Sequence, residues 1–221
     1  MTGHAAAAPP PAAPDVAAWR LFATLGVTGA IAGLLIVVSW GLTQPRIQRN
    51  KADRLRLAVS EVLGAPARFD TLYVVDGALR AEPLPGRAPG ELEQVYAGYA
   101  ADGRLIGFAI AAGEPGFADV VRLIFGYDAS GHRVLGMQVL ESKETPGLGD
   151  KIEKDTAFTR QFREAATPLR GVKADRATGD PHEIDLVTGA TISSRTVVRI
   201  INRALTRLDP LLATYLAEAT R

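Results

Sequence analysis

The β-rich part of the chain runs from residue 94 to residue 140 and reads QVYAGYAADGRLIGFAIAAGEPGFADVVRLIFGYDASGHRVLGMQVL. Its segments 94–100, 104–112, 120–127 and 133–140 are rich in Val, Ile, Tyr and Phe, which favour strands. Turn-forming residues separate them, at Asp102-Gly103 and in residues 113–116 and 128–131. This spacing predicts successive strands in an antiparallel meander.

Helices are expected on both sides of these strands. Residues 48–63 and 150–165 carry apolar residues at helical spacing, and residues 77–91 have the Gly and Pro content of a loop. Short strands are predicted at 171–174 and 184–187. A helix over 193–208 places Val197, Val198, Ile201, Leu205 and Leu208 on one face. Asp209-Pro210 is expected to end it, before a last helix that reaches about Ala219. Grouped strands flanked by helices predict the α+β class.

The N-terminal region has the pattern of a membrane anchor. No residue between Arg20 and Arg46 is charged, and about 20 apolar residues span a hydrocarbon core. Trp19 and Trp40 lie near the two ends, where indole rings favour the membrane interface. A cleaved signal peptide is the rival interpretation, but the following TQPRIQRN offers no small-residue cleavage site. We therefore predict a single retained transmembrane helix.

The predicted organisation has four parts. Residues 1–18 form a disordered lead, because the low-complexity AAAAPPPAAP cannot build a core. Residues 19–45 are the anchor, 46–90 a helical linker and loop region, and 91–221 the folded domain. The basic residues at 46–56 would by themselves place that domain in the cytoplasm, although the charge rule is weaker when a long domain follows the span.

Composition excludes several functions. The net charge of +1 gives no field that would attract nucleic acid. The chain has no cysteine, which excludes disulfides, iron–sulfur ligation, thiolate metal sites and Cys nucleophiles. The histidines, His4, His132 and His182, are too far apart to suggest a metal site. A redox function would therefore need an organic cofactor or other ligands.

Residues 185–194, DLVTGATISS, lie where a predicted strand passes into a predicted helix. Gly189 allows a close backbone approach, and a helix start presents unpaired N–H groups that suit a phosphate. Thr and Ser are also ordinary helix caps, so this segment alone leaves both interpretations open.

Residues 141–150, ESKETPGLGD, form a second loop in which Pro146, Gly147 and Gly149 predict a tight turn. It is no dinucleotide fingerprint, because Ile152 stands where a third glycine would be needed. The P-loop and the hydrolase GxSxG pattern are absent from the sequence.

Together, ETPGLG at 144–149 and D-x-x-[ST]-G-A-T at 185–191 behind an N-terminal anchor resemble the FMN-binding subunits of ion-pumping respiratory complexes. The resemblance is greatest to the G subunits of Rnf electron transport complexes, and the C subunits of sodium-pumping NADH:quinone reductases are near relatives. It implies FMN joined covalently to Thr191 as a phosphoester, with Asp185 recognised by the flavin transferase that makes the bond.

The resemblance also implies roles for the other matching residues. Gly189 and Ala190 would leave room for the ribityl phosphate, and Thr188, Ser193 and Ser194 would donate hydrogen bonds to it. The loop 144–149 would border the isoalloxazine ring, with Glu144, Thr145, Leu148 and Gly149 as its contacts. None of these residues is expected to be catalytic, and the chain is expected to act as a subunit of an oxidoreductase and not to be catalytic alone.

The implied function is that of a single-pass component of a bacterial inner-membrane translocase, relaying electrons between ferredoxin and NAD. Its domain would face the periplasm, and its partners would be the other proteins of the complex, the flavin transferase and membrane lipid. One alternative is a similar complex that keeps a redox-sensing regulator reduced. Another is a non-catalytic, membrane-tethered binding module whose TGAT turn only caps a helix.

Arginines recur every four residues at Arg195, Arg199, Arg203 and Arg207. This stripe is either a solvated face paired with acids or a docking surface for another protein of the complex or for anionic lipid.

Overall fold

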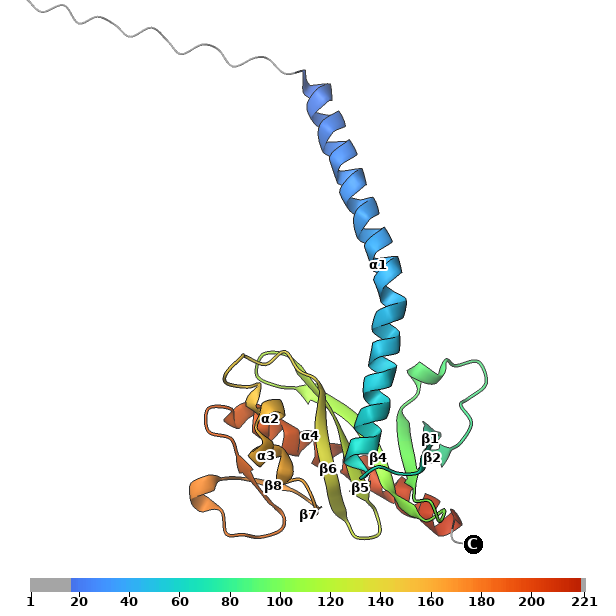
Figure 1. The fold of residues 1–221 in the computed structure, drawn as a ribbon, viewed down its shortest axis with the longest axis vertical. Coiled ribbons are helices and arrows are strands. Elements are labelled where there is room, and N and C mark those ends of the chain that lie inside the picture. The colour runs from blue at the N-terminus through green and yellow to red at the C-terminus, as the bar shows by residue number, and fades with distance from the viewer. Residues whose placement is uncertain (1–16, 220–221) are drawn as a thin grey trace, which may run out of the picture. The chain divides into compact units, whose positions relative to one another are not determined.

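The computed structural model describes residues 17–219. The predicted disordered lead falls almost wholly outside them. The described chain divides into two compact units after Lys51. The first unit contains the start of helix α1, and the second contains the rest of the chain (Figure 1). The domain boundaries expected at residues 18, 45 and 90 stay predictions.

Helix α1 is continuous from Ala18 to Val62 and includes Pro45. The sequence predicted helix on both sides of this proline, and the structure joins the two parts. Pro45 removes one backbone hydrogen bond, but its side chain is exposed and helix-favouring residues follow it. The helix contains one 18-residue window with a mean hydropathy of 2.4, long and apolar enough to cross a membrane.

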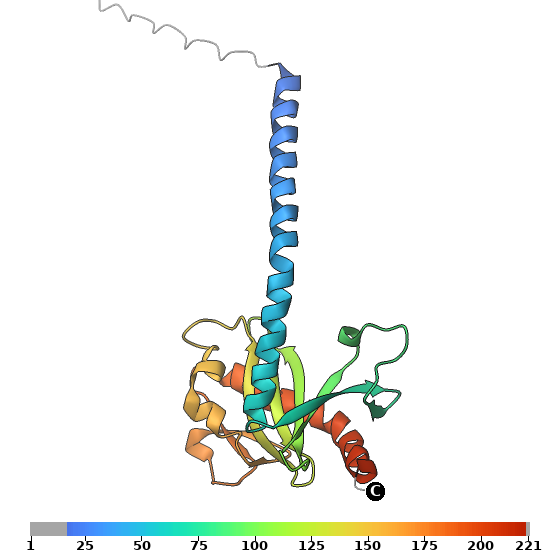
Figure 2. The same ribbon diagram turned by 45° about the vertical axis from the view of Figure 1, so that its right-hand side comes forward.

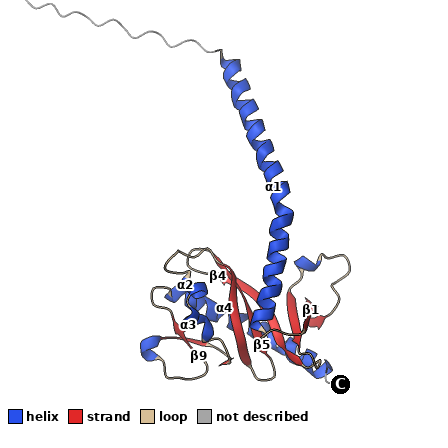
Figure 3. Ribbon diagram, in the orientation of Figure 1, coloured by secondary structure: helices blue, strands red, loops and turns tan. Residues whose placement is uncertain are grey.

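A seven-stranded sheet forms the centre of the second unit, in the order β2-β1-β3-β4-β5-β6-β7 (Figure 3). The strands are β1 (Arg68–Val75), β2 (Ala78–Arg80), β3 (Gln94–Tyr99), β4 (Leu105–Pro115), β5 (Val120–Asp128), β6 (Arg133–Glu141) and β7 (Ala165–Ala166). All neighbours pair antiparallel. The predicted meander is confirmed as β3 to β6. Strands β1 and β2 were not predicted, and β2 lies inside the expected loop 77–91, followed by a 3-10 turn at Pro89–Glu91.

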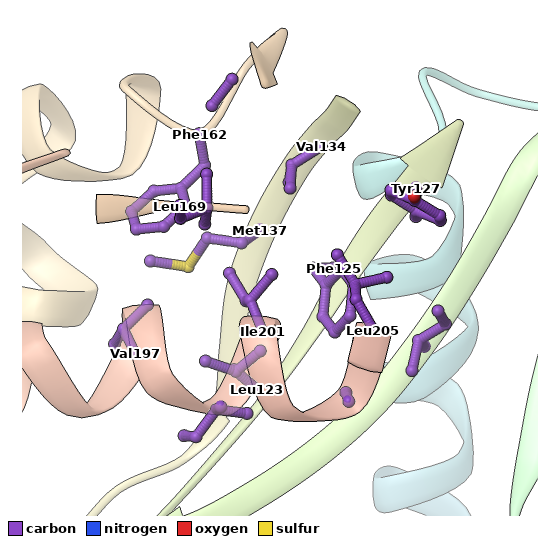
Figure 4. Close-up of a cluster of buried hydrophobic side chains, with 14 of the residues drawn as sticks. Leu123, Phe125, Tyr127, Val134, Met137, Phe162, Leu169, Val197, Ile201 and Leu205 are labelled. Carbon is purple, nitrogen blue, oxygen red and sulfur yellow. The ribbon is translucent and has the colours of Figure 1, made fainter. Parts of the chain in front are cut away.

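The two faces of the sheet bury different helices. Along β3, Val95 and Ala97 belong to the larger core with helix α4 (Thr191–Ala219), whereas Tyr96 packs with the end of α1. This alternation follows the period of two in a strand. Figure 4 shows the larger core, in which Val197, Ile201 and Leu205 of α4 lie with Leu123 and Phe125 of β5. Figure 2 shows α4 crossing one face of the sheet and α1 ending at the other.

Glycines let the end of α1 approach the sheet. A Cβ atom on Gly98 would lie 2.5 Å from the Leu63 Cδ1 atom, and one on Gly126 would collide with the Val62 carbonyl oxygen. The backbone of the helix end therefore packs directly on the strands, at a position where a side chain would push it away.

The helix predicted at 150–165 is two short helices, α2 (Lys151–Lys154) and α3 (Thr156–Arg160). Asp155 between them is extended, and its carboxylate accepts hydrogen bonds from the amides of Ala157 and Phe158. The prediction of one continuous helix was wrong because Asp155 starts a new helix as its N-cap. Phe158 and Phe162 are buried, as the apolar spacing required.

Two parallel strands, β8 (Arg170–Lys173) and β9 (Glu183–Leu186), confirm the short strands predicted near 171 and 184, and a 3-10 turn covers Ala174–Arg176. Helix α4 then runs without a break through Pro210, so the predicted helix end at Asp209-Pro210 was wrong. Pro210 is exposed, while Leu208 and Leu212 on either side are fully buried. Packing on both sides of the proline outweighs the lost backbone hydrogen bond.

The arginine stripe of α4 is largely paired with acids. Arg199 and Arg203 contact the two oxygens of Glu114 at 2.8 and 2.9 Å, and Arg207 pairs with Glu93. These contacts fasten α4 to β4 and to the residue before β3, which agrees with the acid-paired interpretation.

Candidate functional site

A cavity of about 310 Å³ opens at the first turn of α4. Three segments of chain meet there: the β4–β5 loop, the loop that follows β6, and the turn between β9 and α4. The lining residues are Phe117, Glu144, Thr145, Leu148, Gly149, Gly189, Ala190, Thr191, Ile192 and Ser193.

Glu144 connects these three segments. Its side chain is only 5% exposed, and the Ser193 hydroxyl donates a 2.6 Å hydrogen bond to Oε2. The backbone amides of Phe117 and Ala118 donate to Oε1 at 2.9 and 3.0 Å. One buried carboxylate thus joins the β4–β5 loop, its own loop and the start of α4 by hydrogen bonds.

The same contacts set the ionisation of this carboxyl. Burial alone would raise the pKa of Glu144, because it disfavours the charged form. The hydrogen bonds from Ser193 and from the amides of Ala118 and Phe117 outweigh burial and hold the pKa below its usual value. Glu144 is therefore a carboxylate at neutral pH, within the wall of the cavity.

Gly149 is required at its position by Glu144. A Cβ atom there would lie 2.6 Å from Glu144 Oε2 and 3.0 Å from Ser193 Oγ. The last glycine of the ETPGLG segment therefore leaves space for the buried hydrogen bond between these two side chains.

The turn before α4 presents Thr191. Gly189 has a φ of +83°, and the Ala190 amide donates to the Val187 carbonyl at 3.0 Å. Thr191, the first residue of the helix, is half-buried, and its Oγ1 lies 3.5 Å from the Val187 carbonyl oxygen. Such a contact is at the weak limit of hydrogen bonding. Thr191 lines the cavity, beside the unpaired N–H groups of a helix start.

Lys151 adds a cation beside this turn. Its Nζ donates to the Thr188 carbonyl at 3.4 Å and lies 3.6 Å from the position of a Cβ on Gly189. Lys151 is not among the residues predicted from the sequence, although a lysine directly after a Gly-rich loop is a recognisable signal for an anion site. Phe117 and Ile192 are not among them either, and these apolar residues line the cavity with exposed fractions of 66% and 52%.

The predicted site residues come together with few exceptions. Thr188 lies outside the cavity lining and offers its carbonyl to Lys151. Ser194 also lies outside it, because its hydroxyl donates to the Ala190 carbonyl at 2.8 Å inside the helix. Asp185 is on β9, where its backbone amide donates to Gln161 at 2.6 Å.

These groups fit a flavin mononucleotide. A helix N-terminus, Gly189 and Lys151 suit a phosphate. Phe117, Leu148 and Ile192 offer the apolar contacts that a flat aromatic ring needs, and they are exposed in this structure.

The comparisons with known proteins agree with this site. The model of the FMN-binding domain family matches residues 116–206, which include the whole cavity lining. The fold and site therefore define an FMN-binding domain protein.

More extensive matches give the particular family. The G subunit of the ion-translocating oxidoreductase complex of Cronobacter sakazakii is 32% identical over 200 residues, covering 86% of this chain and 91% of that protein. The G subunit of the Na⁺-translocating ferredoxin:NAD⁺ oxidoreductase complex of Acetobacterium woodii is 29% identical, covering 85% and 91%. The chain belongs to this family of G subunits, which confirms the resemblance seen in the sequence.

Solved structures share the fold. NqrC of Shewanella oneidensis superposes with a TM-score of 0.62 at 17% identity, covering 75% of this chain and 99% of that one. The C subunit of the Na⁺-translocating NADH-quinone reductase from Parabacteroides distasonis gives 0.59 at 16% identity, covering 75% and 95%.

Proposed function

We propose that this chain is the membrane-anchored flavoprotein of an ion-translocating oxidoreductase complex and carries FMN as a phosphoester on Thr191. The observation that carries the proposal is the position of Thr191, which lines the cavity and is the first residue of a long helix. An esterified phosphate there would accept hydrogen bonds from the unpaired N–H groups of the first turn. The positive charge of Lys151 would attract it as well.

The residues of the chain would bind and orient the cofactor, which when bound supplies the electron-transfer chemistry. Gly189 would admit the phosphate close to the backbone. Phe117, Leu148 and Ile192 would cover apolar parts of the ring. The phosphoester lies far from the redox-active ring, so its role is retention, and the ring's surroundings would set the reduction potential.

In the assembled complex, this protein would relay electrons between ferredoxin and NAD, together with the other subunits. The C-terminal domain would lie in the periplasm, where free FMN is scarce and a covalent bond prevents its loss. A flavin transferase that recognises Asp185 would attach the cofactor. Basic residues after the apolar span, including Arg46 and Arg49, would contact lipid headgroups.

The test is co-expression of the full chain with a flavin transferase, followed by denaturing electrophoresis and ultraviolet imaging. The wild type and the control variants Thr188→Val and Thr206→Val should give a fluorescent band, and Thr191→Val should give none. Circular dichroism would verify that each variant is folded. Loss of the band in Thr188→Val alone would show that Thr188, and not Thr191, is the attachment site. No band in any protein would favour a binding module whose TGAT turn only caps the helix.

A further inference from the structure

Glu144 is the one charged residue among those that line the cavity in the described part of the chain. Its hydrogen-bond donors are a hydroxyl and backbone amides, which are neutral groups. They stabilise the carboxylate but do not cancel its charge. A full negative charge therefore remains in the same cavity wall as Thr191.

The charge acts at short range through poorly screened surroundings. Glu144 is 5% exposed, so its carboxylate is largely removed from solvent although the residue lines the cavity. Charges in such surroundings interact much more strongly than charges at the surface. Asp119 on the adjacent loop offers a contrast, because its carboxylate is 42% exposed and pairs with Lys143 at 3.2 Å.

We propose that the buried Glu144 carboxylate lowers the reduction potential of the flavin held in this cavity. This inference rests on the proposed function. Each electron that the ring gains without a proton adds a negative charge near Glu144, and the two like charges repel. Glu144 therefore favours the oxidised cofactor and makes the flavin a stronger reductant.

The structure also gives Glu144 a structural role, which the test must separate from the electrostatic one. Glu144→Gln is the suitable variant, because an amide oxygen can accept from Phe117 and Ala118 while the amide nitrogen donates to Ser193 Oγ. The contacts that hold the three segments together can persist while the charge is lost. Ser193→Ala is the complementary variant, because it removes one hydrogen bond and keeps the charge.

The experiment measures the midpoint potential of the full-length, flavin-loaded protein in detergent by spectroelectrochemistry. Glu144→Gln should shift the potential upward. Ser193→Ala should shift it less, and the control Asp119→Asn should leave it close to the wild-type value. An unchanged or lowered potential in loaded Glu144→Gln would overturn the inference. So would an equal upward shift in Asp119→Asn, since that would indicate a general effect of net charge.

A second measurement does not depend on covalent attachment. Protein made without the transferase is titrated with oxidised and with reduced FMN. The wild type should bind the oxidised form more tightly, and Glu144→Gln should narrow the ratio of the two dissociation constants. An unchanged ratio would overturn the inference even if Thr191 proved to be the attachment site. A narrowed ratio, combined with an unmodified Thr191 in protein matured with an active transferase, would keep the inference and reject the ester on Thr191.

Discussion

The Ser193 hydroxyl donates a 2.6 Å hydrogen bond to the Glu144 carboxylate across 49 residues of sequence. This contact joins the loop after β6 to the first turn of α4, and Gly149 leaves the space for it. The walls of the cofactor cavity are therefore set by a buried polar contact as well as by apolar packing.

Gly149→Ala should damage the cavity, because its Cβ would meet Glu144 Oε2 at 2.6 Å. We expect a loss of about 1–3 kcal/mol in the free energy of unfolding, and reduced flavin attachment. Urea denaturation and the fluorescence of the denatured band measure the two effects. Gly90→Ala is the matched control, since a Cβ there meets no atom within 4 Å. Equal stability of the two variants would contradict the packing argument.

Stability should fall in acid partly through Glu144. Its folded-state pKa is lowered by hydrogen bonds that outweigh burial. Its contribution is therefore present above the unfolded-state pKa and is lost as the pH falls through the folded-state pKa. Urea denaturation from pH 7 down to pH 3 should give a flatter stability curve for Glu144→Gln than for the wild type. Parallel curves would show that Glu144 contributes nothing to acid sensitivity.

Tyr127→Phe should weaken the attachment of the C-terminal half of α4. The buried Tyr127 hydroxyl donates to Asp209 at 2.7 Å and lies 3.1 Å from His132 Nδ1. Burial, followed by the hydrogen bond to Asp209, raises the pKa of Tyr127, so the hydroxyl stays a donor. Its removal should cost about 1–3 kcal/mol in denaturant unfolding.

The control for that variant is Tyr99→Phe, whose hydroxyl is 3.2 Å from the neutral hydroxyl of Tyr215. Its loss should cost less, about 0.5–1.5 kcal/mol. A larger loss in Tyr99→Phe than in Tyr127→Phe would contradict the role given to Asp209.

Lys151→Met should slow flavin attachment, because the Lys151 ammonium lies beside the turn that would hold the phosphate. We expect a rate roughly tenfold lower, which corresponds to about 1.4 kcal/mol. The measurement is the initial rate of fluorescence incorporation with purified transferase. Lys154→Met should leave this rate unchanged, because Lys154 is exposed and pairs with Asp150 at 2.7 Å. Equal attachment rates for the two variants would contradict the role of Lys151 in binding the phosphate.

Local sequence signals predicted the meander and the two loops of the site. Strands β3 to β6 were recognisable because Gly, Asp and Pro turns separate runs of β-branched and aromatic residues. Local signals do not predict the helix break at Asp155, which depends on a side-chain cap, or the continuous helix at Pro210, which depends on packing at Leu208 and Leu212. Such tertiary effects override local propensity.

The site shows the same division. The two sequence motifs predicted that Glu144 and Thr191 belong to one site. They predicted Glu144 only as a residue that borders the flavin ring, and not as the residue that joins the three segments. Its burial and its contacts with Phe117, Ala118 and Ser193 join residues distant in sequence, which no local pattern reveals. Lys151 directly follows a Gly-rich loop, a local signal for an anion site, but its place beside the turn before α4 shows only in its contact with the Thr188 carbonyl, 37 residues away.

Peptide mass spectrometry after maturation with a flavin transferase tests the central claim most directly. The peptide that contains Thr191 should carry the mass of FMN less one water, and fragmentation should place the group on Thr191. An unmodified Thr191 peptide from protein shown to have been exposed to an active transferase would contradict the account.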